Sequence, residues 1–291
     1  MPDEGPPSAP SPDALVFQAV TFRAAGADAK AIDLLKQALA VRPDHLNAQI
    51  QLGATYLDQG KTWPALDVLN GAARQAPESD IILRLKALCH LQRNAPLLAV
   101  EEAREAVRID PNDAINHTVL GRTLRQRGDF VGAEAALRRG VELAPRSAYT
   151  LVHLGYFLVN RKRIKDAVVV ADDAGRAAPD DFGVMLLRGD VALRLGRADE
   201  ARDFALWALS QRATNRDAIR LLVSVKAHKS WLLGLWWRLN SSLVLRLLLV
   251  AAMLPLGPLW IIAPIYLIAG RIIFARMLEH ELRSVRLKPD F

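Results

Sequence analysis

Residues 111–145 read PNDAINHTVLGRTLRQRGDFVGAEAALRRGVELAP, and this stretch decides the fold because the interval between its first and last prolines recurs along the chain. Five prolines are each separated from the next by 34 residues: Pro43, Pro77, Pro111, Pro145 and Pro179. A fixed period of about 34 residues is typical of stacked helical repeats. The sequence therefore predicts an array of repeats, which we number so that the proline is position 32.

In this frame the repeats start at residues 12, 46, 80, 114, 148 and 182. Position 20 is alanine in all six: Ala31, Ala65, Ala99, Ala133, Ala167 and Ala201. Position 8 is also small throughout: Ala19, Gly53, Ala87, Gly121, Gly155 and Gly189. Small residues at these positions let two helices cross closely, with bulky residues at positions 7, 11 and 24 around them. Each repeat is thus predicted to be a helix hairpin, and stacking of hairpins buries a continuous core.

Four repeats carry glycine at position 15, where the turn between two helices requires a positive φ angle. These glycines are Gly26, Gly60, Gly128 and Gly196. The whole pattern resembles the tetratricopeptide repeat family over about residues 12–213. The resemblance implies an all-α, right-handed solenoid of about six helix hairpins. Residues 214–228 are predicted to add a capping helix with Ile219, Leu222 and Val223 inward and a polar outer face.

Composition limits the classes of protein and site. Apolar residues make up 51% of the chain and charged residues 24%, which provides for a packed core. A single cysteine, Cys89, excludes an internal disulfide framework and a cysteine-rich zinc site. Residues 1–11 are predicted to be a flexible, proline-rich leader without the features of a secretory signal. We recognise no catalytic constellation, cofactor site or metal site in the sequence.

The C-terminal part has a different composition. Residues 229–241 combine tryptophans with Arg238, which predicts an interfacial amphipathic segment. Residues 247–269 form an uninterrupted run without any charge, long enough to cross a bilayer. We therefore predict a membrane segment over 242–276, followed by a basic polar tail over 277–291. Residues 231 to about 276 resemble the C-terminal anchors of some bacterial repeat proteins, in which a segment of the GLWWR type precedes two membrane helices. The predicted anchor residues are Trp231, Trp236, Trp237, Leu247, Trp260 and Tyr266.

Charge favours one membrane topology over another. Residues 226–291 hold nine Lys/Arg against three Asp/Glu, whereas residues 1–225 hold 29 against 28. The cations flank the apolar run on both sides, so a helical hairpin that keeps both flanks in the cytoplasm is favoured over a single kinked span. A near-neutral body also argues against nucleic-acid binding. We expect a membrane protein, of a bacterial inner membrane, whose repeats face the cytoplasm.

The resemblance also implies a function. In the tetratricopeptide family, first-helix positions 2, 5, 9, 12 and 13 contact an extended peptide or a partner helix. Carried over to this chain, they predict a binding groove that includes Arg84, Arg122, Arg125, Tyr149, Tyr156, Asn160 and Arg194. The lysine and asparagine with which some members clamp a chaperone's terminal carboxylate are absent from positions 5 and 9. We expect a membrane-anchored scaffold for a protein or peptide partner; the alternative is an enzyme whose site lies in the groove.

Overall fold

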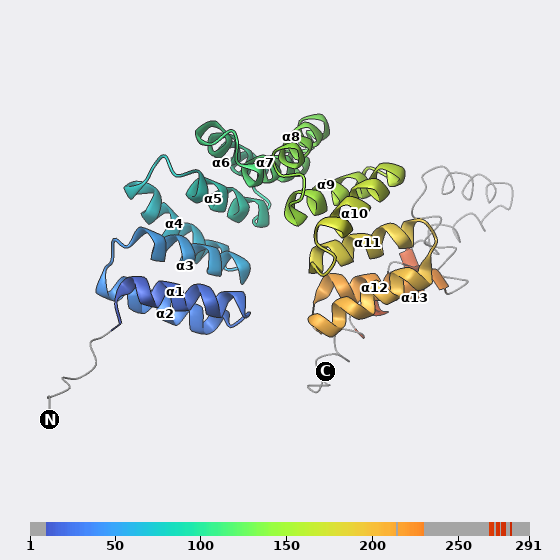
Figure 1. The fold of residues 1–291 in the computed structure, drawn as a ribbon, viewed down its shortest axis with the longest axis horizontal. Helices are drawn as coiled ribbons and strands as arrows, with labels where there is room; N and C mark the ends of the chain where they lie inside the picture. Colours follow the sequence, from blue (N-terminus) through green and yellow to red (C-terminus); the bar gives the residue numbers. More distant parts are fainter. Residues whose placement is uncertain are drawn as a thin grey trace, which may run out of the picture. The chain divides into compact units, whose positions relative to one another are not determined.

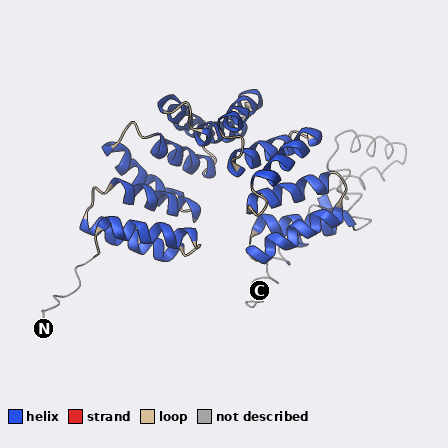
Figure 2. Ribbon diagram, in the orientation of Figure 1, coloured by secondary structure: helices blue, strands red, loops and turns tan. Residues whose placement is uncertain are grey.

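A computed structural model describes residues 10–213 and 215–229 and, nearer the C-terminus, residues 268–270, 272–273, 275–277 and 280. These described residues form helices joined by short loops, without a strand (Figure 2). The chain divides into two compact units, residues 1–145 and 146–291. The first unit contains helices α1 to α8 and the second contains α9 to α13 (Figure 1), and we describe each by itself.

The helices come in pairs, one pair for each predicted repeat. The first helices are α1 (Pro12–Ala24), α3 (Leu46–Asp58), α5 (Asp80–Gln92), α7 (Ala114–Arg127), α9 (Ala148–Asn160) and α11 (Phe182–Arg194). The second helices are α2 (Asp28–Val41), α4 (Thr62–Gln75), α6 (Pro96–Ile109), α8 (Phe130–Leu143), α10 (Ile164–Ala177) and α12 (Ala198–Gln211). Every first helix begins at a predicted repeat start, so the helix hairpins and their frame are confirmed.

The turns at position 15 have the predicted left-handed backbone. Gly128, for example, has a φ of 90°, and the other three glycines behave alike. In the two repeats without glycine, Asn94 and Lys162 take the same place, with φ of 57° and 61°. Asparagine tolerates this region, whereas lysine is strained in it. The hairpin therefore imposes this backbone geometry even where the residue does not favour it.

Position 8 is a point of close contact between neighbouring helices. In the first unit, a Cβ atom on Gly53 would lie 2.7 Å from Leu69 Cγ. A Cβ atom on Gly121 would lie 2.6 Å from Leu137 Cγ and 3.0 Å from the carbonyl oxygen of Ala133. Both leucines occupy position 24 of the same repeat, and both are buried. The predicted pairing of a small residue at position 8 with a bulky one at position 24 is confirmed in these repeats.

In three repeats position 24 is alanine, so it cannot fill the space beside the small residue at position 8. These alanines are Ala103, Ala171 and Ala205. In the second unit the side chain comes from the next repeat. A Cβ on Gly155 would lie 2.4 Å from Leu187 Cδ2, and one on Gly189 would lie 2.4 Å from Leu221 Cδ2. Both leucines are position 6 of the following first helix. The expectation of a bulky position 24 is thus wrong for these three repeats, and in the second unit the first helix of the next repeat supplies the missing volume.

Helix α13 (Arg216–Lys229) starts one repeat period after α11 and so occupies the place of the first helix of a seventh repeat. It packs on α11 and α12 through a cluster that includes Leu221 and Val225. Ile219 and Val223 are buried as predicted, whereas Leu222 is only half-buried. Ile219 and Leu221 lie on opposite sides of the helix, about 200° apart. Over residues 216–228 the exposed residues of α13 are all charged: Arg216, Asp217, Arg220 and Lys226.

No helix of the described residues is long and apolar enough to cross a membrane. The predicted apolar run lies outside the described residues as far as residue 267, as do the leader up to residue 9 and the segment 230–241. The six predicted anchor residues also lie outside them: Trp231, Trp236, Trp237, Leu247, Trp260 and Tyr266.

The crossing of α7 and α8 gives a first testable prediction. Ala133 is fully buried and its carbonyl oxygen faces Gly121, so a larger side chain has no free volume. We expect Ala133→Leu to lower the free energy of unfolding by about 1–3 kcal/mol through overpacking. Ala135→Leu is the control, because Ala135 lies on the same helix and is exposed. Equal shifts in the denaturant midpoint for the two variants would contradict the packing described here.

Candidate functional site

The structure brings three of the predicted groove residues together in the second unit. Tyr156 and Asn160 on α9 and Arg194 on α11 line one pocket of about 590 Å³. Its other lining residues come from α11 and α13: Phe182, Gly183, Leu186, Asp190, Asp217, Arg220, Leu221 and Ser224. The pocket therefore lies across three consecutive first helices, α9, α11 and α13 (Figure 1).

The repeat frame explains why these residues meet. Gly183, Leu186, Asp190 and Arg194 are positions 2, 5, 9 and 13 of the sixth repeat. Residues three or four apart share one face of a helix, so the same positions of neighbouring first helices line one groove. Asp217, Arg220 and Ser224 are positions 2, 5 and 9 of the α13 helix counted as a seventh repeat. Sequence reasoning missed them because it ended the frame at the sixth repeat.

Asp190 carries the unusual electrostatics of the pocket. Its carboxylate is half-buried between lining residues that include the buried Leu186 and Leu221. Among the described residues no hydrogen bond or ion pair reaches this carboxylate within contact distance. Burial raises the pKa of Asp190 above its usual 3.8, although the positive charges of Arg194 and Arg220 act in the opposite direction. The pocket thus contains a desolvated carboxylate without a direct partner.

Tyr156 faces the same electrostatic environment from α9. Burial raises the pKa of its hydroxyl, and the negative charges of Asp190 and Asp217 raise it further. The phenol is therefore neutral at physiological pH and keeps its proton as a hydrogen-bond donor. The hydroxyl of Ser224 is already engaged, since it donates to the carbonyl oxygen of Arg220 at 2.8 Å.

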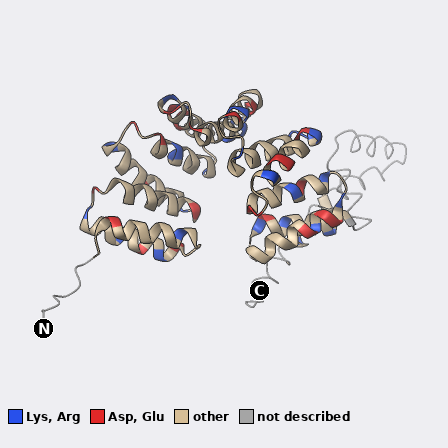
Figure 3. Cartoon of the chain, viewed as in Figure 1, with Lys and Arg blue, Asp and Glu red and all other residues tan. Residues whose placement is uncertain are grey.

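Charged groups of both signs surround this interior. Arg194, Asp217 and Arg220 are exposed, and so is Asn160. Lys/Arg and Asp/Glu positions are interspersed along the helices of the second unit (Figure 3). These charges are exposed at the pocket, whereas Asp190 is half-buried in it.

The other predicted groove residues are placed elsewhere. Tyr149, on α9, packs edge-on against the His153 ring with centroids 4.5 Å apart, and does not line the pocket. Arg122 is half-buried and Arg125 is exposed, both on α7 of the first unit. Sequence position alone therefore placed three of the seven residues at one site.

Arg84 belongs to a polar network between the third and fourth repeats. Its Nη1 donates to Asp113 Oδ2 at 2.9 Å and to the side-chain oxygen of Asn116 at 2.8 Å. It also lies 3.6 Å from Asp80 Oδ2, one helical turn earlier. The amide of Asn116, which is fully buried, donates to Asp80 at 3.0 Å. The arginine side chain is only 14% exposed, so it contributes to packing between repeats rather than to an open groove.

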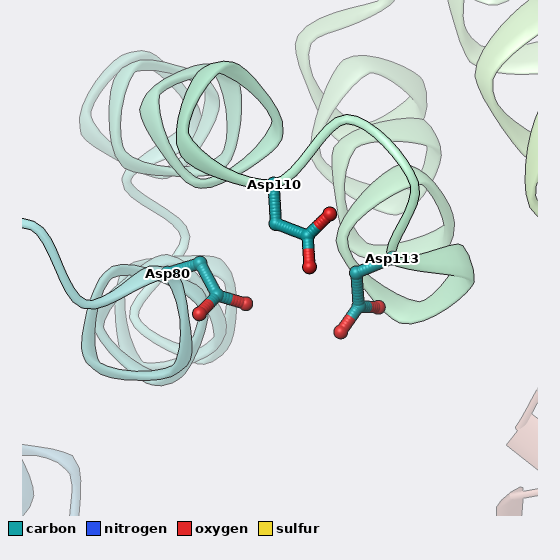
Figure 4. A group of neighbouring side chains, drawn as sticks. All are labelled: Asp80, Asp110 and Asp113. Carbon is teal, nitrogen blue, oxygen red and sulfur yellow. The ribbon is translucent and has the colours of Figure 1, made fainter.

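The same network contains three carboxylates, Asp80, Asp110 and Asp113, whose oxygens lie within 4.8 Å of one another (Figure 4). This grouping has the donor chemistry of a site for a hard cation. However, Arg84 supplies positive charge to Asp80 and Asp113, and Asp113 Oδ1 caps α7 by accepting from the backbone N–H of Asn116 at 3.0 Å. Asp80 and Asp113 therefore already share a cation supplied by the protein, and Asp110 accepts from the backbone N–H of Asn112 at 2.9 Å.

Cys89 is fully buried on α5. Burial raises the pKa of its thiol to about 11. The thiol therefore stays protonated near neutral pH and is a poor nucleophile there.

The unpaired Asp190 predicts an unusual dependence of stability on pH. The pKa of Asp190 is higher in the folded chain than in the unfolded chain. At pH values between these two pKa values the folded state therefore binds more protons than the unfolded state. The free energy of unfolding therefore falls as pH rises through this window. Asp190→Asn removes the effect, so we expect a melting temperature above that of the wild type near pH 7, with the difference shrinking in acid. A less stable Asp190→Asn protein near pH 7 would mean that the carboxylate has a stabilising partner.

Two segments of the chain match models of a known protein family. Residues 22–89 and residues 118–182 each match a model described as tetratricopeptide repeat. The comparison with curated proteins finds no match.

Solved structures agree on the fold. A thermophilic tetratricopeptide repeat protein of Thermus thermophilus is 21% identical over 64% of this chain and 99% of its own, with a TM-score of 0.59. One from Parabacteroides merdae is 15% identical over 74% and 84%, with a TM-score of 0.64. PilW, described as a widely conserved type IV pilus biogenesis factor, is 18% identical over 72% and 98%, with a TM-score of 0.57. At these identities the likeness shows the fold alone.

Proposed function

We propose that this chain is an interaction scaffold that holds a protein or peptide partner. Residues 22–89 and 118–182 match models of the tetratricopeptide repeat, a class that generally mediates protein–protein interactions. The observation that carries the proposal is the pocket across α9, α11 and α13. Its volume of about 590 Å³ suits several residues of an extended segment. Tyrosine and arginine, which line it at Tyr156, Arg194 and Arg220, often anchor interfaces.

We further propose that the scaffold is anchored in a membrane by its C-terminal part, with the repeats at the cytoplasmic face of a bacterial inner membrane. The sequence supports this, since residues 247–269 carry no charge. As a helix they would reach about 34 Å, against a hydrocarbon core of about 30 Å. Basic residues on both sides favour a helical hairpin over a single span.

Co-purification tests the scaffold. The full chain in mild detergent is used as bait, alongside Asn160→Trp, which places a large ring at the pocket, and Asp203→Trp on the exposed part of α12 as the matched control. We expect a stoichiometric partner protein that Asn160→Trp loses and Asp203→Trp keeps. Turnover of a small molecule without any partner would favour the enzyme alternative.

Reporter fusions test the anchor. A reporter that is active only outside the cytoplasm is fused before Met1 in one protein and after Phe291 in another. The hairpin predicts that both ends report the cytoplasm and that the protein sediments with membranes. An exported C-terminus would replace the hairpin by a single span, and a chain that never sediments with membranes would end the anchor proposal.

A further inference from the structure

We propose that the pocket across α9, α11 and α13 receives one basic side chain, lysine or arginine, of an extended partner segment, and that the Asp190 carboxylate is its counter-ion. This inference rests on the proposed function and names what the groove recognises. It starts from the lining of the pocket, in which Asp190 is a half-buried carboxylate without a direct partner among the described residues.

Such a carboxylate is costly in the free protein. Removing an ionised group from water is unfavourable unless an opposite charge or hydrogen-bond donors replace the lost water. In the described chain no side chain donates to Asp190, and Arg194 and Arg220 act on it only at longer range. A ligand that brings a positive group into direct contact would satisfy this carboxylate.

The lining indicates a cation rather than an anion. The lining also carries the cations Arg194 and Arg220, which act on Asp190 more strongly than Asp217 does. Both arginines are exposed, whereas Asp190 is half-buried, so a group that enters the pocket meets the carboxylate, which attracts an ammonium or guanidinium group and repels a carboxylate. The exposed Arg220 can then donate to acceptors of the bound segment, such as backbone carbonyl oxygens.

The apolar lining suits the rest of such a side chain. Lysine and arginine carry a charged head on a stem of methylene groups, and the stem packs well on apolar surface. Phe182, Leu186 and Leu221 provide that surface next to Asp190. The Tyr156 hydroxyl, which stays protonated, lies in the same pocket and can hydrogen-bond to the segment.

As the pH falls, binding of the basic side chain should weaken at a higher pH than an ordinary salt bridge does. The groups that face Asp190 are Arg194 on its own helix, Asp217 and Arg220 on α13, and Tyr156 on α9. Of these only Asp217 is a carboxylate, and burial raises the pKa of Asp190 above that of an ordinary one. Binding is therefore lost at a higher pH than the usual carboxyl value, because protonated Asp190 no longer attracts a cation.

A random peptide array tests the inference. The full chain in mild detergent is applied to arrayed peptides whose termini are acetylated and amidated, so that the only cations are side chains. We expect the retained peptides to share a basic residue at one position. Whether this residue is lysine or arginine shows which of the two side chains the pocket prefers. Asp190→Asn should bind the best peptide about tenfold or more weakly, since a counter-ion is lost. Asp203→Asn, an exposed carboxylate of α12, should bind it like the wild type.

Three outcomes separate this inference from the proposed function. If the wild type retains peptides that share no basic residue, the groove binds peptides but the inference is wrong. If the retained peptides are basic but Asp190→Asn binds them equally well, another group is the counter-ion and the inference is again wrong. If the wild type retains no peptide at all, both the groove function and the inference fail.

Discussion

Replacing Leu187 by alanine is expected to lower the free energy of unfolding by about 2–5 kcal/mol, the range for a fully buried leucine. Leu187 has no exposed surface, and its Cδ2 fills the space above Gly155. Leu206→Ala on α12 is the control, because Leu206 is 44% exposed and exposed sites usually change stability by less than about 0.5 kcal/mol. Denaturant unfolding of the full chain measures both.

A second substitution makes this test specific for the contact. Gly155→Ala alone places a methyl group 2.4 Å from Leu187 Cδ2 and should destabilise by overpacking. In the double variant with Leu187→Ala, the methyl group enters space that the leucine has left. We expect the double variant to be more stable than the sum of the single effects by about 0.5–3 kcal/mol. Strict additivity would mean that the two positions do not touch.

Arg84→Met is expected to destabilise the fold by about 2–4 kcal/mol. Methionine keeps much of the stem volume but removes the charge that Asp80 and Asp113 share. Removing one partner of a fully buried ion pair costs about 3–5 kcal/mol, and these side chains are 14–24% exposed, so we expect somewhat less. Arg104→Met is the control, because Arg104 is an exposed arginine of α6 in the same unit.

The same proteins distinguish a packing network from a metal site. With Arg84 as the counter-ion, added Ca²⁺ or Mg²⁺ should leave the melting temperature of the wild type unchanged. In Arg84→Met, Asp80 and Asp113 lose their cation, and the same salts should raise the melting temperature of this variant by mass action. A large stabilisation of the wild type by either ion would show that Asp80, Asp110 and Asp113 bind metal in preference to Arg84.

The sequence predicts the helices of this chain closely because one constraint recurs in every repeat. Small residues at position 8 and a turn at position 15 fix where the paired helices begin, and α7 and α11 start at their predicted residues. The turn at Lys162 shows that the hairpin geometry persists where its glycine is missing. The sequence also predicts helix α13, over 214–228 against the observed Arg216–Lys229, but not its place as the first helix of a seventh repeat. The proline and small-residue signals fade after the sixth repeat while the repeat period itself continues.

The site was less predictable for a different reason. Position in the repeat shows which face of a helix a residue occupies, but not which charges lie across from it. Arg84 occupies a groove position, yet Asp113, which precedes the first helix of the next repeat, holds it in a network between repeats. Asp190 was overlooked although it is position 9 of its repeat, because its missing partner is a property of three helices together.

Photo-crosslinking from the pocket in living cells tests the central claim, that a partner protein binds in the groove of the second unit. A photoreactive phenylalanine derivative replaces Asn160 at the pocket or, as the control, Val169, which is 60% exposed on α10. We predict a discrete protein adduct from residue 160 that is absent from residue 169 and that Asp190→Asn weakens. No adduct from residue 160, or the same adducts from both positions, would contradict the claim.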